Sequence, residues 1–231
     1  ALLARRALHA GAPVSPSPEQ MRALIEAHTE IARPPLCPEL RLHLVTERCA
    51  LWRAGEDELA ALGLPPPYWA FCWAGGQALA RYLLDHPDAV HGRNVLDFGA
   101  GGGVEALAAA RAGASAVLAS DIDPFAVQAL EMNAALNDVR LTATSRDLLG
   151  LDEGWDVVLA GDVCYDRALA GQVQAWLERL AARGADVLVG DPRRGYLDES
   201  RLSRIAELDA PSDVDVEGRY LRRTGIFRVL G

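Results

Sequence analysis

The sequence predicts an α/β fold built on a seven-stranded, mostly parallel sheet with an antiparallel last strand. A small helix-and-strand extension is expected over residues 1–64 and the main domain over residues 65–231. Three observations lead to this fold. From residue 94 onward, short apolar runs alternate with segments of helical periodicity, which is typical of strand–helix–strand units. Half of the 231 residues are hydrophobic, so a sizeable core is available. The last two expected strands are joined by a loop too short for a crossover helix, so they should pair antiparallel.

Composition narrows the classes of function. The formal net charge is −9 and no window is strongly basic, which disfavours binding to a nucleic-acid backbone and favours a small-molecule or protein substrate. All 23 cationic residues are arginine, so no lysine is available as a base or Schiff-base former. The four cysteines are widely spaced and predict neither a metal site nor a disulfide framework. No apolar run reaches transmembrane length.

The N-terminal extension begins with a helix signal. Ser17 and Gln20 have the spacing of a capping box. Apolar residues at helical spacing continue the helix to Ile31, and the proline pair beginning at Pro34 stops it. Residues 40–45 alternate and predict a half-buried strand. No function is assigned to this extension.

A dense group of aromatic residues follows a run of three prolines. Tyr68, Trp69 and Phe71 are expected in the core. Trp73 stands before a glycine pair and a helix expected over residues 77–84. This position makes Trp73 a candidate for the rim of a ligand pocket.

The elements of the main domain follow from local patterns. Asp123 and Pro124 predict the cap and first residue of one helix, and Asp198 is expected to cap another that runs to Leu208. Strands that are apolar throughout indicate a sheet covered on both faces. The expected strands are 95–98, 116–120, 140–144, 156–160, 185–189, 214–216 and 226–229, and the expected helices are 104–112, 124–134, 169–180 and 198–208.

A glycine-rich turn follows the first strand of the main domain. Glycine lets backbone approach a ligand because it carries no Cβ. The dinucleotide fingerprint fails here, because Val104 occupies its sixth position. The stretch from Asp97 to Gly103 is Asp-x-Gly-x-Gly-x-Gly, which resembles motif I of the Rossmann-like methyltransferases that use S-adenosylmethionine (SAM); an ordinary strand-to-helix turn is the alternative. The candidate cofactor-binding residues of this turn are Asp97, Gly99, Ala100, Gly101 and Gly103.

Acidic residues follow the next two strands. Asp121 lies about twenty residues beyond Gly101, the spacing at which an acid binds ribose hydroxyls. Asp123 is the rival acid, but it is also the expected helix cap. Asp147 is a candidate for the adenine amino group, with a solvated loop acid as the alternative.

The loop after the fourth strand carries the candidate catalytic residues. Asp162, directly after Gly161, should face the transferred group and is the leading substrate contact. Tyr165 and Asp166 would flank the entering substrate, with helix capping as the alternative for Asp166. Asp191 ends the fifth strand and is expected to be structural.

Stretches between residues 67 and 192 carry a more specific resemblance. They are Pro67-Tyr68-Trp69-Ala70, Trp73-Ala74-Gly75-Gly76-Gln77-Ala78-Leu79, Tyr82-Leu83-Leu84-Asp85, Asp121-Ile122-Asp123-Pro124, Gly161-Asp162, Tyr165-Asp166 and Gly190-Asp191-Pro192. Together they are similar to the electron-transfer-flavoprotein beta-subunit lysine methyltransferases, which belong to the seven-strand protein lysine methyltransferases. The resemblance implies a class I methyltransferase fold in which SAM is held by Trp73, the motif I turn, Asp121, Ile122, Asp147 and Gly161, and in which Asp162, Tyr165 and Asp166 meet the lysine.

Two departures from the family pattern are visible. Ala100 and Gly102 stand where relatives often have serine and cysteine, in a turn whose contacts are mostly made by backbone. Cys164 is often aromatic in relatives, which changes the expected shape of the substrate channel.

The expected function is methylation of a lysine on the electron-transfer-flavoprotein beta subunit, with S-adenosylhomocysteine as the product. A neutral amine would attack the sulfonium methyl directly, and alignment of the two reactants would supply most of the rate. Asp162 would orient the amine and not act as a strong base, because a carboxylate stabilises ammonium. No metal, nucleic acid or membrane is expected to take part. The expected location is cytoplasmic, or the mitochondrial matrix for a eukaryotic source.

Several other functions stay open. One is a methyltransferase for another acceptor, such as a ribosomal-protein lysine or a small amine, and a second is a non-catalytic SAM-binding module. A glutamine methyltransferase fits less well, because Asn-Pro-Pro-Tyr is absent after the fourth strand. A nicotinamide-dependent dehydrogenase fits least, because of Val104.

Overall fold

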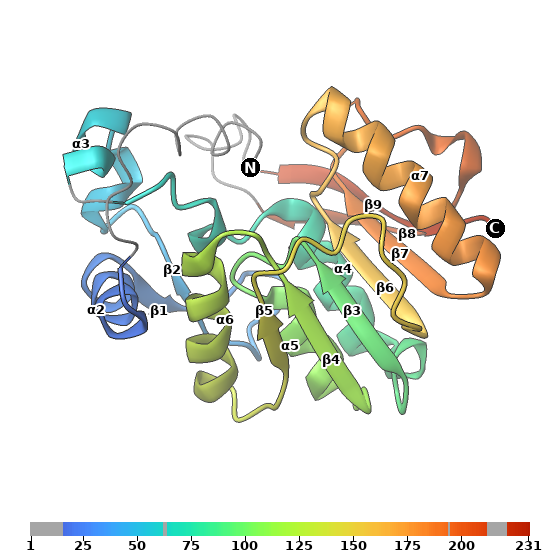
Figure 1. Cartoon of the computed structure of the whole chain (residues 1–231), viewed down its shortest axis with the longest axis horizontal. Helices are drawn as coiled ribbons and strands as arrows, with labels where there is room; N and C mark the ends of the chain where they lie inside the picture. The colour runs from blue at the N-terminus through green and yellow to red at the C-terminus, as the bar shows by residue number, and fades with distance from the viewer. Residues whose placement is uncertain (1–15, 62–63, 194, 212–220) are drawn as a thin grey trace.

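The computed structural model describes residues 16–61, 64–193, 195–211 and 221–231 (Figure 1). Its main strands are β3 (Asn94–Phe98), β4 (Ala116–Ser120), β5 (Thr142–Thr144), β6 (Val157–Gly161), β7 (Asp186–Asp191), β8 (Leu202–Pro211) and β9 (Leu221–Val229). They form one sheet of order β5-β4-β3-β6-β7-β9-β8. All neighbours pair parallel except β9, which runs antiparallel to both β7 and β8. The predicted seven-stranded α/β fold is confirmed.

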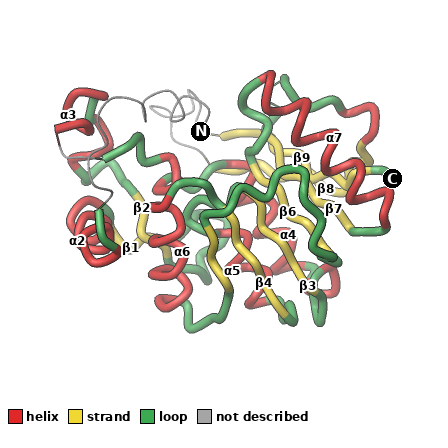
Figure 2. Tube along the Cα trace, in the orientation of Figure 1, coloured by secondary structure: helices red, strands yellow, loops and turns green. Residues whose placement is uncertain are grey.

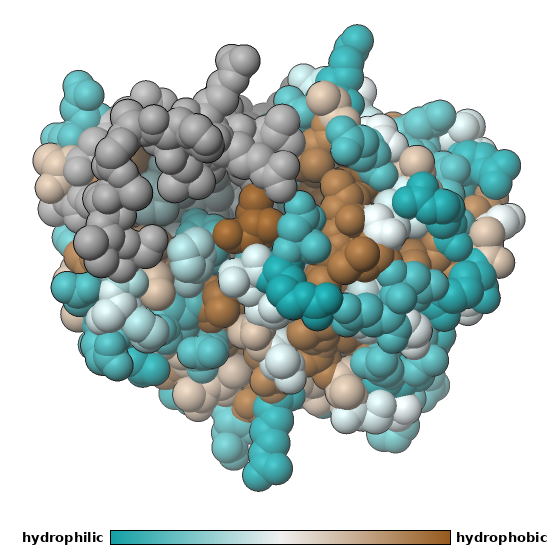
Figure 3. All heavy atoms as spheres, viewed as in Figure 1, coloured by the Kyte–Doolittle hydropathy of each residue, from teal (hydrophilic) through white to brown (hydrophobic). Residues whose placement is uncertain are grey.

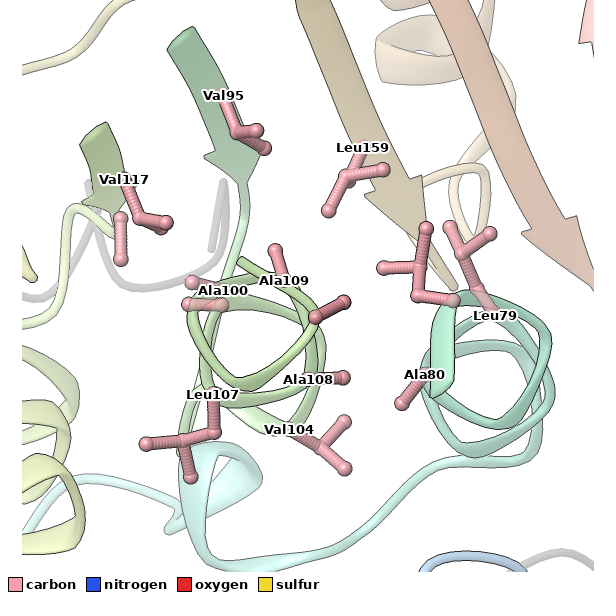
Figure 4. Close-up of a cluster of buried hydrophobic side chains, with 14 of the residues drawn as sticks. Leu79, Ala80, Val95, Ala100, Val104, Leu107, Ala108, Ala109, Val117 and Leu159 are labelled. Carbon is pink, nitrogen blue, oxygen red and sulfur yellow. The ribbon is translucent and has the colours of Figure 1, made fainter. Parts of the chain in front are cut away.

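Helices cover both faces of the sheet (Figure 2). The main ones are α4 (Ala74–Asp85), α5 (Val104–Arg111), α6 (Pro124–Leu136) and α7 (Arg167–Arg183). Successive strand residues face opposite sides, as a strand requires. Leu159 packs in the core with α4 and α5, whereas Val158 packs with Trp176 of α7. Figure 4 shows Val95 and Leu159 pointing from the sheet toward α5 and α4.

The N-terminal extension holds a helix and a small separate sheet. Its elements are α2 (Pro18–His28), β1 (Glu30–Ala32), β2 (Leu42–Leu44), the 3-10 helix η1 (Ala50–Arg53) and α3 (Glu56–Ala61). The capping box of Ser17 and Gln20 is confirmed. The helix ends earlier than predicted, because the backbone at Thr29 is extended. Ile31 lies in β1, and its side chain is exposed. All three residues of β2 are buried, so the prediction of a half-buried strand was wrong there.

The extension shares its core with the main domain. Met21 and Ile25 of α2 pack with Phe125 and Met132 of α6. The buried leucines of β2 belong to the same cluster as the residues of α4 and α5. The boundary at residue 64 stays a prediction, and apolar packing crosses it.

The start of α4 and the 3-10 helix before it differ from expectation. Helix α4 begins three residues earlier than predicted, with both glycines inside it. Trp69 is buried in η2 (Tyr68–Ala70) as expected, and Phe71 is partly buried. Tyr68 is 61% exposed, so its placement in the core was wrong. A further 3-10 helix, η3, spans Pro87–Ala89.

The sixth strand is not where it was predicted. Asp198 caps only the 3-10 helix η4 (Glu199–Arg201), and the expected helix to Leu208 is the strand β8. A bulge between Arg204 and Ala206 inserts a residue and shifts the alternation of β8, which produced a helix-like spacing of apolar residues. The predicted strand 214–216 lies outside the described residues.

Three other features bear on function. In the described ranges, no helix is long and apolar enough to cross a membrane. The four cysteines are free of disulfides, and burial raises the pKa of Cys37 and of Cys164 to about 12. Among the residues that the structure describes, no group of three or more His, Cys, Asp or Glu is arranged to hold a metal ion.

Candidate functional site

Most of the predicted site residues gather where β3, β4 and β6 end, whereas Asp147 follows β5 and Trp73 precedes α4. These carboxyl ends lie side by side, because the three strands are parallel neighbours. Ligands of open parallel sheets bind at this edge. Figure 3 shows apolar residues gathering in the centre of the visible face, beside these strand ends, within a mostly hydrophilic surface.

The glycines of the turn between β3 and α5 have two different tasks. Gly99, Gly101 and Gly103 have φ of +72°, +51° and +87°, where residues with a Cβ are strained. Gly103 is buried, and a Cβ there would overlap Leu130 of α6. Gly99 is exposed. The turn therefore packs against α6 at its end and is open at its start.

Backbone amides of the turn are already used within the protein. The amides of Gly99 and Ala100 both donate to the carbonyl of Ser120, at 2.9 and 3.0 Å, and the amide of Gly103 donates to the carbonyl of Ala100 at 2.7 Å. A pyrophosphate needs free N–H donors. A turn whose amides are engaged offers mainly carbonyl oxygens, which suit an ammonium group. This arrangement fits the amino-acid end of SAM better than a dinucleotide.

Asp121 joins the turn to the end of β4. Its Oδ2 accepts from the amide of Gly101 at 2.9 Å and its Oδ1 from the amide of Asp123 at 2.9 Å. Burial raises the pKa of Asp121, and the two amides oppose that rise. Each carboxylate oxygen keeps a lone pair for a hydroxyl. The rival Asp123 caps α6 through the amide of Phe125 at 2.8 Å, and Ile122 is 42% exposed beside them.

Asp97 lies behind the turn and supports it. It is fully buried, and its Oδ2 accepts from the amide of Ala106 at 2.9 Å. Its carboxyl interacts with that of Glu105, which is also buried. Asp97 Oδ1 and Glu105 Oε1 have no other partner among the described residues. Burial, followed by the charge of Asp97, raises the pKa of Glu105 and so favours its neutral form.

Asp162 is fixed at the N-terminus of α4. Its Oδ2 accepts from the amide of Gly76 at 2.9 Å, and its own amide donates to the carbonyl of Gly190 at 2.9 Å. Its φ of +54° is unusual for a residue with a Cβ. A Cβ on Gly75 would lie 2.5 Å from Asp162 Oδ2, so glycine there allows the close approach. The carboxylate is partly exposed and is positioned by the helix end.

Gly161 belongs to the same close-packed junction. A Cβ on it would lie 2.5 Å from Glu105 Oε1 and 2.8 Å from the Cα of Gly76. Gly161 therefore allows α4 to approach β6. Its contact with SAM stays a prediction.

Tyr165 and Asp166 lie beyond Asp162 and differ in their surroundings. Tyr165 is 46% exposed, and burial of its ring followed by the charge of Asp121 raises its pKa. The phenol therefore lies within the field of the Asp121 carboxylate. Asp166 caps α7, accepting from the amides of Ala168 and Leu169 at 3.0 Å each. This capping contact supports the structural alternative for Asp166.

Trp73 is the N-cap residue of α4. Its Nε1 donates to the carbonyl of Tyr68 at 2.9 Å, and its ring centroid lies 5.6 Å from that of Phe71. A cleft of about 320 Å³ runs beside it, lined by residues that include Trp52, Phe71, Trp73, Gln77 and Pro211. None of the strand-end residues lines this cleft, so the position of Trp73 at the rim of the cofactor pocket stays a prediction.

Asp147 lies on the loop after β5. Its Oδ1 accepts from the amide of Leu149 at 3.1 Å, which shapes the loop. Ser120 holds the same loop to β4, because its hydroxyl donates to the carbonyl of Arg146 at 3.1 Å. Asp147 is thus carried next to β4, and its contact with adenine stays a prediction.

Sequence reasoning missed two contributors to the site. Ser120 binds the turn through its carbonyl, for which side-chain patterns carry no signal. Glu105 had a signal in the sequence, since it is the only charged residue between Val104 and Ala110 of a buried helix.

The chain is similar to known methyltransferases. A family model described as ribosomal protein L11 methyltransferase (PrmA) matches residues 78–164. The electron transfer flavoprotein beta subunit lysine methyltransferase of Danio rerio is 39% identical over 92% of this chain and 84% of its own length. The same-named protein of Xenopus laevis is 47% identical over 79% of this chain and 74% of its own length.

Solved structures bear out the fold. The 16S rRNA N2 G1207 methyltransferase of T. Thermophilus aligns with a TM-score of 0.56 and 19% identity, over 88% of this chain and 50% of that one. The magnesium protoporphyrin IX methyltransferase of Synechocystis, solved with bound S-adenosylhomocysteine, aligns with a TM-score of 0.51 and 16% identity, over 78% and 91% of the two chains. The chain is a SAM-dependent methyltransferase, and it belongs to the electron transfer flavoprotein beta subunit lysine methyltransferase family.

Proposed function

We propose that this enzyme methylates a lysine of the electron transfer flavoprotein beta subunit. The observation that carries this choice of acceptor is the similarity to enzymes named for that substrate, over 84% of the length of the Danio rerio protein. The net charge of −9 supports a protein acceptor over a nucleic acid. The free cysteines are compatible with a reducing, cytoplasm-like compartment, or with the mitochondrial matrix for a eukaryotic source.

The donor side of the site is assigned to the glycine turn and Asp121. SAM supplies a methyl group activated by its sulfonium charge. The carbonyls of the turn would bind the donor's ammonium, and Asp121 would accept from the ribose hydroxyls while it keeps its bond to the amide of Gly101. The exposed side chain of Ile122 is suited to pack against the adenine ring.

The acceptor side is assigned to Asp162 and Tyr165. A lysine in water has a pKa of about 10.4, so the amine must lose a proton before it attacks. Asp162 stabilises the ammonium form and would therefore act by orienting the amine as a hydrogen-bond acceptor, while its Oδ2 keeps the bond to the amide of Gly76. The partly exposed Tyr165 lies on the same loop and would exclude water from the amine.

Competition between protein substrates tests the acceptor. The purified enzyme is incubated with labelled SAM and an equimolar mixture of the flavoprotein beta subunit and ribosomal protein L11, and peptides are analysed by mass spectrometry. We expect methylated lysine in the beta subunit alone. Methylation of L11 alone would overturn this acceptor and support the ribosomal-protein alternative, which the family model over residues 78–164 favours. The Asp162→Asn variant serves as the inactive control.

A further inference from the structure

Asn133 of α6 is a fully buried amide that bonds two distant parts of the chain. Its Nδ2 donates to the carbonyl of Gly102 in the glycine turn at 2.8 Å. Its Oδ1 accepts from the amide of His43 in β2 at 2.8 Å. A buried side chain whose two ends are both satisfied resists movement of either partner, because breaking a bond leaves a buried group unpaired.

Close packing also holds the glycine turn in place near Gly102. A Cβ on Gly102 would lie 2.8 Å from the carbonyl oxygen of Trp69 and 3.7 Å from Leu42 of β2. Gly103 packs without clearance on Leu130, one helical turn before Asn133. Helix α6 therefore supports the turn through an apolar contact and a polar one.

We infer that Asn133 is a positioning residue for SAM binding, because it fixes the glycine turn to β2 and makes the N-terminal extension part of the framework of the donor site. The inference rests on the proposed use of the turn to bind SAM. Asn133 has no exposed surface, so it acts through the backbone of Gly102. The neighbouring amide of Gly101 is the one that holds Asp121, and rotation of the turn would disturb both.

Asn137, the partly buried C-cap residue of α6, provides a control. Its Oδ1 accepts from the amide of Arg41 at 2.9 Å, and its Nδ2 donates to the carbonyl of Arg41 at 2.6 Å and to the backbone carbonyl of Asn133 at 2.7 Å. Both asparagines therefore tie α6 to the segment around β2. Of the two, Asn133 is the one whose side chain reaches the turn.

The test compares Asn133→Asp with Asn137→Asp. Both substitutions keep the acceptor oxygen of the side chain and replace its donor nitrogen by oxygen. In Asn133→Asp a carboxyl oxygen therefore faces the carbonyl oxygen of Gly102, and both are acceptors. Calorimetry gives the dissociation constant for SAM, and kinetics give KM and kcat. For Asn133→Asp we expect SAM to bind about tenfold or more weakly, from loss of one buried hydrogen bond, with kcat at saturating SAM retained. Asn137→Asp should bind SAM within about twofold of wild type.

Stability separates positioning from a merely structural role. Both variants should unfold at lower temperature, since Asn133→Asp loses the bond to Gly102 and buries a carboxyl, and Asn137→Asp loses the bonds to the carbonyls of Arg41 and Asn133. Equal SAM affinity in both variants, whether unchanged or equally weakened, would overturn the inference. If Asn133→Asp does not fold, the same comparison is made with Asn133→Ala and Asn137→Ala. Gly101→Val distinguishes a failure of the proposed donor site from a failure of this inference. If Gly101→Val binds SAM normally, the donor site itself is refuted. If Gly101→Val does not bind SAM but Asn133→Asp binds it as tightly as wild type, only the role of Asn133 is refuted.

Discussion

Replacing Glu105 by glutamine should make the stability of the protein less sensitive to pH. Glu105 is only 3% exposed, and its carboxyl lies against that of Asp97. Its Oε1 has no partner in the described part of the chain except this neighbouring acid. Glutamine has the shape of the protonated acid and keeps a donor for Asp97. The substitution therefore mimics the state that the fold requires.

The size of the effect follows from proton linkage. Burial raises the pKa of Glu105 well above the value of 4.5 that it has in the unfolded chain. The folded protein then holds a proton that the unfolded chain releases, so stability is full below that value and falls as the pH rises. While Glu105 stays protonated in the fold, the free energy of unfolding falls by about 1.4 kcal/mol per pH unit. Glu105→Gln has no such proton to lose, so it does not incur this loss of stability.

Urea unfolding at pH 5, 6 and 7 measures this difference. The stability of Glu105→Gln relative to wild type should increase steadily across the series. Glu131→Gln removes an exposed glutamate from α6 and controls for the loss of a surface charge. Parallel pH profiles for Glu105→Gln and wild type would refute the buried, protonated state of Glu105.

Three further substitutions test the site. Asp162→Asn keeps the acceptor for the amide of Gly76, so SAM affinity should stay within about twofold of wild type while kcat falls by roughly 100-fold. Calorimetry measures the affinity and single-turnover kinetics measure the rate, and a large loss of SAM binding would contradict the assigned role. Gly101→Val places a β-branched residue at a φ of +51°, and calorimetry should show no SAM binding by a folded protein. Gly161→Ala forces a Cβ to 2.5 Å from Glu105, which should lower the free energy of unfolding by about 1–3 kcal/mol in urea; an unchanged midpoint would exclude the close contact.

Much of the donor side could be predicted from the sequence, because its signals are local. The strand before the glycine turn, the turn and the cap at Asp123 each follow from neighbouring residues. The spacing from Gly101 to Asp121 also predicted that the two residues lie close together, since neighbouring parallel strands of similar length end at the same edge of the sheet. The structure joins these two residues by a hydrogen bond of 2.9 Å.

Other features could not be predicted, because their cause lies far along the chain. The bulge in β8 shifts its alternation, and only pairing with β9 shows that this segment is a strand. The interaction of Asp97 with Glu105 depends on the direction of two side chains across a strand–helix turn. The extension looked like an addition in the sequence, and it shares the core with α6 through Met21 and Ile25.

The acceptor side depends on positions that have no side chain. Gly75 and Gly190 face each other so closely that a Cβ on either would overlap the backbone of the other, and a Cβ on Gly161 would lie 2.8 Å from the Cα of Gly76. These contacts bring the N-terminus of α4 onto the ends of β6 and β7, where the amide of Gly76 can hold Asp162. A sequence shows that these residues are glycines, but it does not show which backbone each one approaches. The carboxylate proposed to orient the lysine is thus placed by close backbone packing, and any added methyl group at this junction should move it.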